Sequence, residues 1–112
     1  MARVIRLAGL LAVAMFIGGV GSASAQAPSG EAVYAAQKCS MCHSLDGKGQ
    51  AKGPLDGVGS KMSAEDIRLW IVDPATMTKK HNALRKPPMR AYPNLPKADL
   101  DALVTFLAAK KK

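Results

Sequence analysis

Both cysteines of this 112-residue chain lie in one short motif, Cys39-Ser-Met-Cys42-His43. Thiols at positions i and i+3 lie on one side of a helical turn, so both can bond to the same planar group. A histidine directly after the second thiol is then carried beneath that group as an axial ligand, the pattern of c-type haem attachment. We therefore expect Cys39 and Cys42 to form thioethers to one haem c, with His43 bound to its iron.

Three other kinds of site compete with haem attachment. A redox-active dithiol of the thioredoxin type belongs in a βαβ unit, and no segment has a convincing strand pattern. A zinc site needs a fourth nitrogen or sulfur ligand, for which only His81 remains. A plain disulfide between Cys39 and Cys42 leaves His43 without a role. Haem attachment is the interpretation that uses all three residues of the motif.

The N-terminal segment has the three parts of a secretory signal peptide. Arginines precede an apolar run over residues 7–20, and the small-residue pattern Ala23-Ser-Ala25 follows. The run is shorter than the roughly 20 apolar residues that a spanning helix needs, and an uncleaved anchor lengthened through the next two residues is the alternative. We expect export to the periplasm and cleavage after Ala25, so that residues 1–25 are a signal peptide.

The mature chain has room for one small domain. Residues 26–29 predict a disordered lead-in, and the domain spans residues 30–112. Small domains bury a smaller share of their surface and often need a metal, a disulfide or a cofactor for stability. Aromatic residues make up only 4% of the chain. A bound porphyrin would therefore occupy the space where a larger domain keeps its hydrophobic interior.

Three segments have helical patterns. Residues 31–38 are rich in helix formers; residues 63–73 begin with a capping-box pattern and end before a proline; residues from 97 onward carry a leucine-rich stripe. Residues 46–61 are rich in glycine and predict an irregular loop, and the proline-containing residues 75–96 predict a loop with one short helix at most. The sequence therefore predicts an all-α domain with three main helices and long loops.

The order of these motifs resembles the class I c-type cytochromes, the small electron carriers of bacterial periplasm and mitochondria. The likeness covers nearly all of residues 30–109. It is carried by the attachment motif, by Lys52-Gly53-Pro54-Leu55, by Trp70-Ile71-Val72-Asp73-Pro74, by Lys86-Pro87-Pro88-Met89, and by a leucine-rich C-terminal helix. A four-helix cytochrome c′-type bundle would carry the attachment motif near its C-terminus instead. The resemblance implies a cytochrome c-like fold, in which the N- and C-terminal helices cross at one end of a covalently bound haem.

The second axial ligand has five candidates in the mature chain: Met41, Met62, Met77, Met89 and His81. Met41 lies inside the attachment motif, on the His43 side, and cannot reach across the macrocycle. Met89 follows two prolines, whose restricted backbone can hold a thioether at the iron with little loss of entropy. The family resemblance and this stiffness together favour Met89, with packing in the core as the alternative role. His/Met ligation raises the potential relative to a bis-His haem.

The resemblance also implies supporting residues around the haem. The ring N–H of His43 should donate to the carbonyl of Pro54, which fixes the orientation of the ring. Trp70 should pack beside the haem on the methionine side, where its N–H needs a propionate or a buried water, or it is an ordinary core residue. Tyr92 is a further candidate for a hydrogen bond at the haem edge.

The N-terminal helix departs from the family pattern. Gly30 and Tyr34 lie one residue further from Cys39 than the matching glycine and aromatic residue of many relatives. One extra residue turns a helical face by about 100°. Either the helix has a local bulge, or Ala35 or Val33 replaces Tyr34 in the expected contact with Phe106.

The charge of the chain is +8, from 16 basic and 8 acidic residues. Basic residues flank the attachment motif (Lys38, Lys48, Lys52) and Met89 (Lys79, Lys80, Arg85, Lys86, Arg90). They could steer an acidic redox partner to an exposed haem edge, or they could be a solvated surface with no partner. Nucleic acid binding is not expected, because no basic run is interleaved with aromatic residues.

The expected function is electron transfer by Fe(II)/Fe(III) cycling at a haem ligated by His43 and Met89. We expect a monomeric carrier rather than an enzyme, with no small-molecule substrate and with membrane contact only through its partners. An alternative is a haem c electron-relay subunit of a periplasmic oxidoreductase complex. A haem-based sensor or peroxidase is a third possibility, and it would need an open position on the iron.

Overall fold

The computed structural model describes residues 18–19 and 28–112. The predicted cleavage site after Ala25 and the apolar run before it lie outside the described residues, apart from Gly18 and Gly19. Within the described part, no helix is both long enough and apolar enough to cross a membrane.

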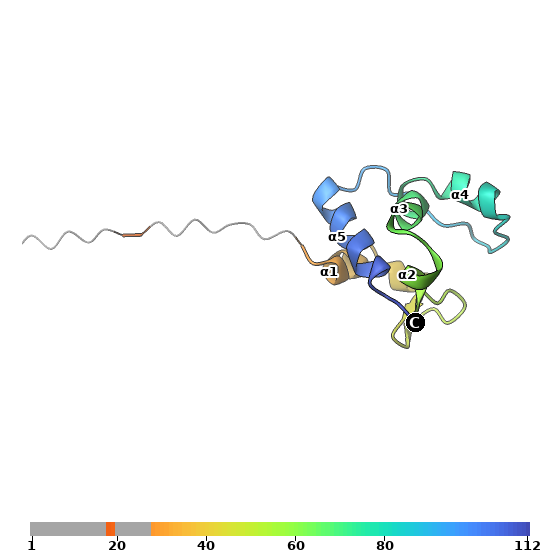
Figure 1. Ribbon diagram of the computed structural model, residues 1–112, viewed down its shortest axis with the longest axis horizontal. Helices are drawn as coiled ribbons and strands as arrows, with labels where there is room; N and C mark the ends of the chain where they lie inside the picture. Colours follow the sequence, from red (N-terminus) through yellow and green to blue (C-terminus); the bar gives the residue numbers. More distant parts are fainter. Residues whose placement is uncertain (1–17, 20–27) are drawn as a thin grey trace, which may run out of the picture.

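Helices dominate the described residues, with one very short hairpin (Figure 1). The helices are α1 (Gly30–Ala36), α2 (Val58–Lys61), α3 (Ala64–Val72), α4 (Pro74–His81) and α5 (Lys97–Ala108), with a 3-10 turn, η1 (Cys39–Met41), after α1. The all-α prediction with three main helices is confirmed by α1, α3 and α5. Helix α2 is additional, and α4 is the one short helix that the sequence allowed in the segment after Asp73.

The hairpin joins β1 (Ser44–Leu45) to β2 (Lys48–Gly49) in antiparallel register, with Leu45 opposite Lys48. The two loop residues, Asp46 and Gly47, both have positive φ angles, 52° and 81°. Asp-Gly is the favoured pair for a two-residue hairpin turn because it tolerates this left-handed backbone. The sequence analysis included this segment in an irregular loop, which was wrong for these residues.

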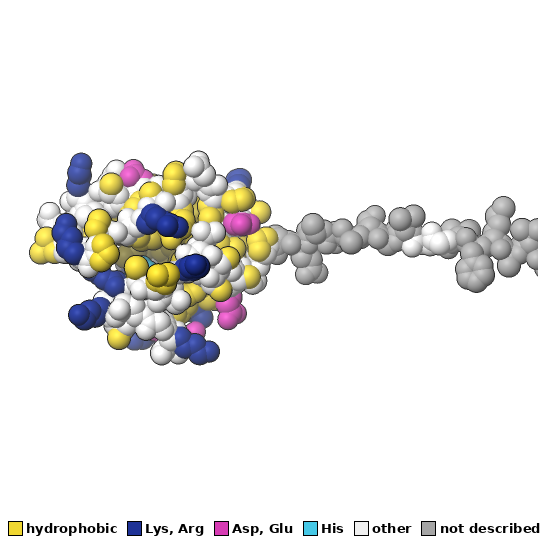
Figure 2. All heavy atoms as spheres, turned by 180° about the vertical axis from the view of Figure 1, so that it is seen from behind, with side chains coloured by type: hydrophobic (Ala, Val, Ile, Leu, Met, Phe, Trp, Pro, Cys, Tyr) yellow, Lys and Arg dark blue, Asp and Glu magenta, His cyan; other side chains and the backbone are white. Residues whose placement is uncertain are grey.

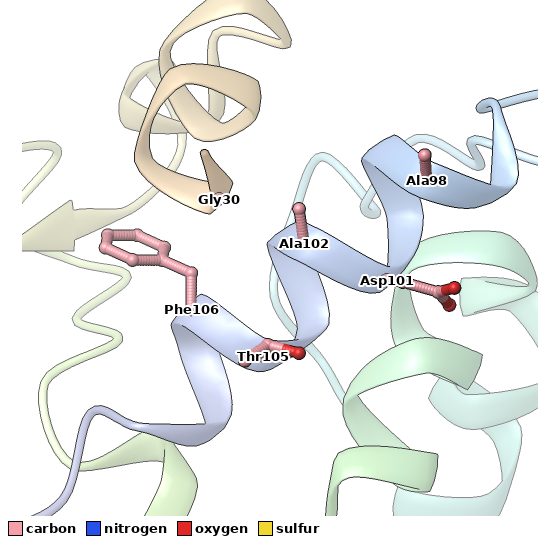
Figure 3. Close-up of a pocket in the computed structure, with 6 residues that line it drawn as sticks. All are labelled: Gly30, Ala98, Asp101, Ala102, Thr105 and Phe106. Atoms are coloured by element: carbon pink, nitrogen blue, oxygen red, sulfur yellow. The ribbon is translucent and has the colours of Figure 1, made fainter. Parts of the chain in front are cut away.

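Helices α1 and α5 cross closely, as expected for the N- and C-terminal helices (Figure 1). The Ser29 hydroxyl accepts a hydrogen bond from the Ala32 N–H at 3.1 Å and so caps the start of α1. One residue later, Gly30 lies directly against α5, between Ala102 and Phe106 (Figure 3). A Cβ at this position would overlap the Ala102 carbonyl and the Phe106 Cβ, so the crossing requires glycine.

Tyr34 itself makes the contact with Phe106, at a ring-centroid distance of 6.0 Å and an interplanar angle of 59°. Ala35 is exposed. The extra residue before Cys39 causes no bulge within α1, and the backbone becomes irregular only after the helix ends at Ala36. Lys38 has a left-handed backbone, with φ of 56°, between the end of α1 and η1. The alternative in which Ala35 or Val33 replaces Tyr34 is therefore wrong, and the irregularity lies outside the helix.

Helix α3 packs on α5 and completes the core. The Ser63 hydroxyl accepts from the Asp66 N–H at 3.1 Å, which is the cap that the sequence predicted. Buried Ile67 and Ile71 of α3 belong to the same apolar cluster as Leu103 of α5. The apolar spacing of both helices is therefore explained by one shared interface.

Helix α3 ends at Val72, as the proline after Asp73 predicted. Asp73 then caps α4, because its carboxylate accepts from both the Thr76 N–H at 3.3 Å and the Thr76 hydroxyl at 2.7 Å. Pro74 occupies the first turn of α4, where its missing N–H costs nothing. The segment predicted as loop therefore starts with the short helix α4 and becomes irregular only after His81.

The helix crossing can be tested with Gly30→Val. Valine at position 30 should lower the free energy of unfolding of the holoprotein by about 1–3 kcal/mol or more, the usual cost of overpacking a close contact. Guanidinium unfolding measures the change. As a control, Ala35→Val also creates valine on α1, but on an exposed position, and should cost only about 0.5 kcal/mol in helix propensity. Equal effects of the two variants would contradict the crossing.

Candidate functional site

The attachment motif lines a cavity of about 510 Å³ at the centre of the domain. Its wall includes apolar side chains from α3 and α5 and from the loops on either side of them: Leu55, Ile67, Ile71, Leu95, Leu103 and Leu107. Figure 2 shows hydrophobic side chains gathered on one face of the domain, with Lys and Arg side chains among and around them. Several segments that are distant in sequence thus enclose one apolar space.

Cys39 and Cys42 both face this cavity. No disulfide joins them in this structure, in which Cys39 is half-buried and Cys42 is exposed. Burial is the main cause that raises the pKa of Cys39. Among residues 18–19 and 28–112, no three His, Cys, Asp or Glu side chains are grouped as metal ligands. His81 stacks on Trp70 instead, with ring centroids 6.0 Å apart, which removes the fourth ligand of the zinc alternative.

The His43 ring is held by a backbone carbonyl, but not by the predicted one. Nδ1 of His43 lies 3.0 Å from the carbonyl oxygen of Gly53, so the prediction of Pro54 is wrong by one residue. The reason is a short parallel pairing between the two segments, in which the Ser44 N–H donates to Gly53 O at 3.1 Å and the Leu55 N–H donates to Ser44 O at 2.8 Å. This register directs the Gly53 carbonyl, and not that of Pro54, to the imidazole.

The bond to Gly53 decides which ring nitrogen of His43 is free. A carbonyl oxygen only accepts, so Nδ1 carries the proton and donates it, which leaves Nε2 with a lone pair for a metal. Burial lowers the pKa of His43, the Gly53 carbonyl raises it, and the positive charge of Arg85 lowers it. The net shift is downward, toward the neutral form that binds metals.

Two methionines line the cavity, Met62 and Met89. Met77 is instead packed in the interior, with only 1% of its surface exposed, and it does not line the cavity. Met41 is 71% exposed on the attachment segment. His81 is exposed. Of the five candidates for a second axial ligand, the structure therefore places Met89 and Met62 in the same cavity as His43.

Two polar groups in the cavity wall have no partner of their own. Trp70 Nε1 and Tyr34 OH are both buried without a hydrogen bond within the described residues, and both side chains line the cavity. An unsatisfied buried polar group typically costs about 1–3 kcal/mol. Such groups fit a bound molecule that is largely apolar and carries polar substituents. The sequence analysis predicted this need for Trp70 but not for Tyr34, because the one-residue shift of its helix obscured which way Tyr34 faces.

Tyr92 also lines the cavity, but its hydroxyl is already bonded. It donates to the Gln37 carbonyl at 3.3 Å, and the Tyr92 N–H donates to Ile71 O at 2.8 Å. The guanidinium of Arg90 lies 5.2 Å from the centroid of the Tyr92 ring. Tyr92 thus joins the segment after Met89 to the end of α1, and the candidate hydrogen bond from Tyr92 to the haem edge stays a prediction.

Arg85 is a site residue that sequence analysis grouped only with the basic flank. Its side chain lines the cavity, and Nη2 donates to the Cys42 carbonyl. Nothing in the local sequence indicates this contact, since it depends on the path of the loop after α4.

A second hollow lies away from the motif, beside the crossing of Gly30 and α5 (Figure 3). It is lined by Gly30, Ala98, Asp101, Ala102, Thr105 and Phe106. The single carboxylate there, Asp101, is paired with Arg68 and Lys97, both at 2.6 Å. These pairs lower the pKa of Asp101. The hollow is a crevice of the helix crossing and offers no chemistry like that of the central cavity.

The family called Cytochrome c matches residues 27–111 of the chain. The chain belongs to the cytochrome c family. This confirms the resemblance to class I c-type cytochromes and the cytochrome c-like fold. A curated relative, Cytochrome c oxidase subunit 2 of Alkalihalophilus pseudofirmus, is 30% identical over 94 residues. The match covers 76% of this chain and 26% of that protein, so the chain spans about a quarter of the relative's length. No solved structure matches the chain.

Membership of the cytochrome c family implies one covalently bound haem c and haem-based electron transfer. The residues present fit this group. Cys39 and Cys42 have the spacing for two thioethers, the cavity wall is mainly apolar, and Trp70 and Tyr34 leave polar hydrogens without partners. When bound, the haem supplies an iron that exchanges one electron between Fe(II) and Fe(III).

The dependence of the fold on the haem can be tested with Cys39→Ser/Cys42→Ser. The variant should release its pigment in acid–acetone, whereas the parent protein should keep it. An empty space of about 510 Å³ would cost up to about 12 kcal/mol at roughly 24 cal/mol per Å³, less whatever water entering from the open side recovers. This is as large as the whole stability of a typical domain, about 5–15 kcal/mol, so thermal unfolding should lose its cooperativity.

The control for this experiment is Met41→Ser, which changes an exposed residue within the same motif and should keep both haem and cooperative unfolding. A haem-free double variant with a cooperative unfolding transition at the parent's stability would contradict the prediction.

Proposed function

We propose that this chain is a non-enzymatic electron carrier whose haem iron is bound by His43 and Met89. The observation that carries the proposal is that His43, Met89 and both cysteines line one cavity. The Gly53 carbonyl orients the imidazole and leaves Nε2 free. A thioether opposite this imidazole favours the reduced iron and suits a carrier that accepts electrons readily.

Met89 is favoured over Met62 by its surroundings. Pro87, Pro88 and Arg90 line the cavity together with Met89, so a continuous segment forms that part of the wall. Met62 is isolated, because its neighbours on either side do not line the cavity. A continuous, proline-stiffened segment holds a ligand with less entropy loss than one side chain at the end of the short helix α2.

The ligand proposal is tested by comparing Met89→Ala with Met62→Ala. Met89→Ala should lower the reduction potential, abolish the absorption band of thioether-bound ferric haem, and let the reduced protein bind carbon monoxide at neutral pH. Met62→Ala removes a methionine from the same cavity and should leave the band in place. If Met62→Ala loses the band and Met89→Ala keeps it, the ligand assignment is wrong.

The absence of acidic groups from the cavity supports a carrier rather than an enzyme. Of the described residues that line it, none is Asp or Glu. A carboxylate is a common general acid or base, and an enzyme or peroxidase would need such groups close to the reacting atoms. The cavity wall instead combines apolar side chains with basic ones, which suits a haem buried in protein and reached through its edge.

Charge at the cavity points to acidic partners. Lys38, Arg85 and Arg90 line the cavity and are also exposed at the surface, and Lys52 and Lys86 are exposed on the segments beside them. We propose that this basic edge steers an acidic redox protein toward the haem. Electrostatic attraction speeds such encounters without requiring tight binding, and electron-transfer complexes often bury less than about 1,200 Å². In this proposal the protein is a monomer, takes no small-molecule substrate and meets membranes only through its partners.

We propose a periplasmic location. The support is in the sequence: a charged start, a short apolar run and the Ala23-Ser-Ala25 pattern. Cleavage after Ala25 would leave Gln26 as the first residue. The periplasm is an oxidising compartment, and we expect the thioethers to Cys39 and Cys42 to form there after export.

A second candidate is a haem c electron-relay subunit of a periplasmic oxidoreductase. It is favoured by the relative named Cytochrome c oxidase subunit 2, in which the matching region is about a quarter of a longer protein. In that relative a similar region is part of a longer chain. In this second proposal, the present chain instead binds a separate catalytic subunit non-covalently.

Protein purified from the periplasm separates the two candidates. A free carrier should begin at Gln26, elute alone in high salt, and be reduced by an acidic partner at a rate that falls as ionic strength rises. A larger subunit that stays bound in high salt would favour the relay role. An N-terminus at Met1 in the mature protein would contradict signal-peptide cleavage.

A further inference from the structure

Arg85 connects the two walls of the haem cavity. It lies four residues before Met89, on the segment that follows α4. Its Nη2 donates to the carbonyl of Cys42, on the attachment segment. Its Nη1 lies over Gly53, where an added Cβ would overlap both the guanidinium and the Cys42 carbonyl. One side chain therefore contacts the two backbone segments on the far side of the cavity.

These contacts surround the support of His43. Cys42 directly precedes His43, and Gly53 provides the carbonyl that orients the imidazole at 3.0 Å. Gly53 is buried, and the missing side chain leaves the space in which the guanidinium lies. Arg85 thus contacts the backbone on both sides of the histidine, while its own segment carries Met89.

The other basic residues near Met89 have different surroundings. Arg90 lies over the ring of Tyr92 at 5.2 Å. Lys86 is exposed and does not line the cavity, although it is the next residue along the chain. Arg85 is exposed too, but its guanidinium donates to a backbone carbonyl, and such a charge-assisted hydrogen bond is stronger than a neutral one. Arg85 is therefore more than one of several charges at the edge of the cavity.

We propose that Arg85 is a positioning residue: it clamps the Met89 segment onto the attachment segment and keeps a fixed positive charge beside His43. The proposal rests on the proposed function, since it assigns Arg85 a role toward the haem ligands. Two consequences follow from two different properties of the side chain. The charge favours the reduced iron, which is less positive, and the hydrogen bond from Nη2 to the Cys42 carbonyl holds the Met89 segment in place.

The test uses the holoprotein and two variants of Arg85. Arg85→Gln removes the charge and the guanidinium's hydrogen bond to Cys42, and should shift the ratio of reduced to oxidised haem at a fixed potential several-fold toward the oxidised form. It should also lower the pH at which the ferric protein loses its thioether band by about one unit. This shift corresponds to a tenfold smaller preference for the Met89-bound state, as expected for the loss of one charge-assisted hydrogen bond. Arg85→Lys keeps the charge, so the redox ratio should stay near the parent value while the pH midpoint still falls.

The matched control is Lys86→Gln, which removes the same charge from the adjacent residue. It should leave the pH midpoint unchanged and move the redox ratio less than Arg85→Gln does. Equal effects of Arg85→Gln and Lys86→Gln on both quantities would overturn the proposal, and so would an unchanged pH midpoint in Arg85→Gln.

A separate measurement distinguishes failure of the clamp from failure of the ligand assignment. Amide hydrogen exchange of residues 82–86 in the ferric holoprotein should be faster in Arg85→Gln than in Lys86→Gln, whichever side chain binds the iron. If the parent protein lacks a thioether band, Met89 is not the ligand, but faster exchange would still support the clamp. Unchanged exchange would reject the clamp even if Met89 is the ligand.

Discussion

The helices of this domain close around a cavity rather than around a continuous core of side chains, and every other feature depends on what fills that space. Left dry, a cavity of about 510 Å³ would cost up to about 12 kcal/mol, less whatever entering water recovers, which is comparable with the whole stability of a typical domain. The haem of the cytochrome c family therefore has a structural role as well as a redox role. Trp70 Nε1 and Tyr34 OH agree with this, because both are buried in the cavity wall with no hydrogen-bond partner among the described residues.

The two walls of the cavity differ in how they are held. On the histidine side, the Ser44 N–H to Gly53 and the Leu55 N–H to Ser44 form a continuous backbone network that fixes the imidazole. On the methionine side, the irregular segment after α4 is joined to the rest of the domain through individual contacts of Arg85 and Tyr92. The histidine side is therefore the more rigid support, and the methionine side depends on a few side chains.

The sequence predicted the elements whose signals are local. Ser63 and Pro74 marked the limits of α3, and the spacing of Cys39, Cys42 and His43 predicted a covalently bound haem. Predictions that required a register failed by small amounts: the carbonyl at His43 belongs to Gly53 and not Pro54, because a parallel pairing sets which one faces the ring. The contact of Arg85 with Cys42 was not predictable, since it depends on a loop path after α4 that no local pattern encodes. One short helix was predicted in the segment after Asp73, and the Asp73 cap sets where α4 begins.

The left-handed residue between α1 and the attachment motif has a consequence for how this family varies. Lys38 rotates the chain after the helix has ended, so Gly30 and Tyr34 keep their places on α5 although the distance to Cys39 has grown by one residue. The direction in which Cys39 points therefore does not depend on the helical periodicity of α1. One residue more in this linker is therefore compatible with the same crossing of α1 and α5, because the left-handed backbone at Lys38 and not the helix sets the direction in which the chain reaches Cys39.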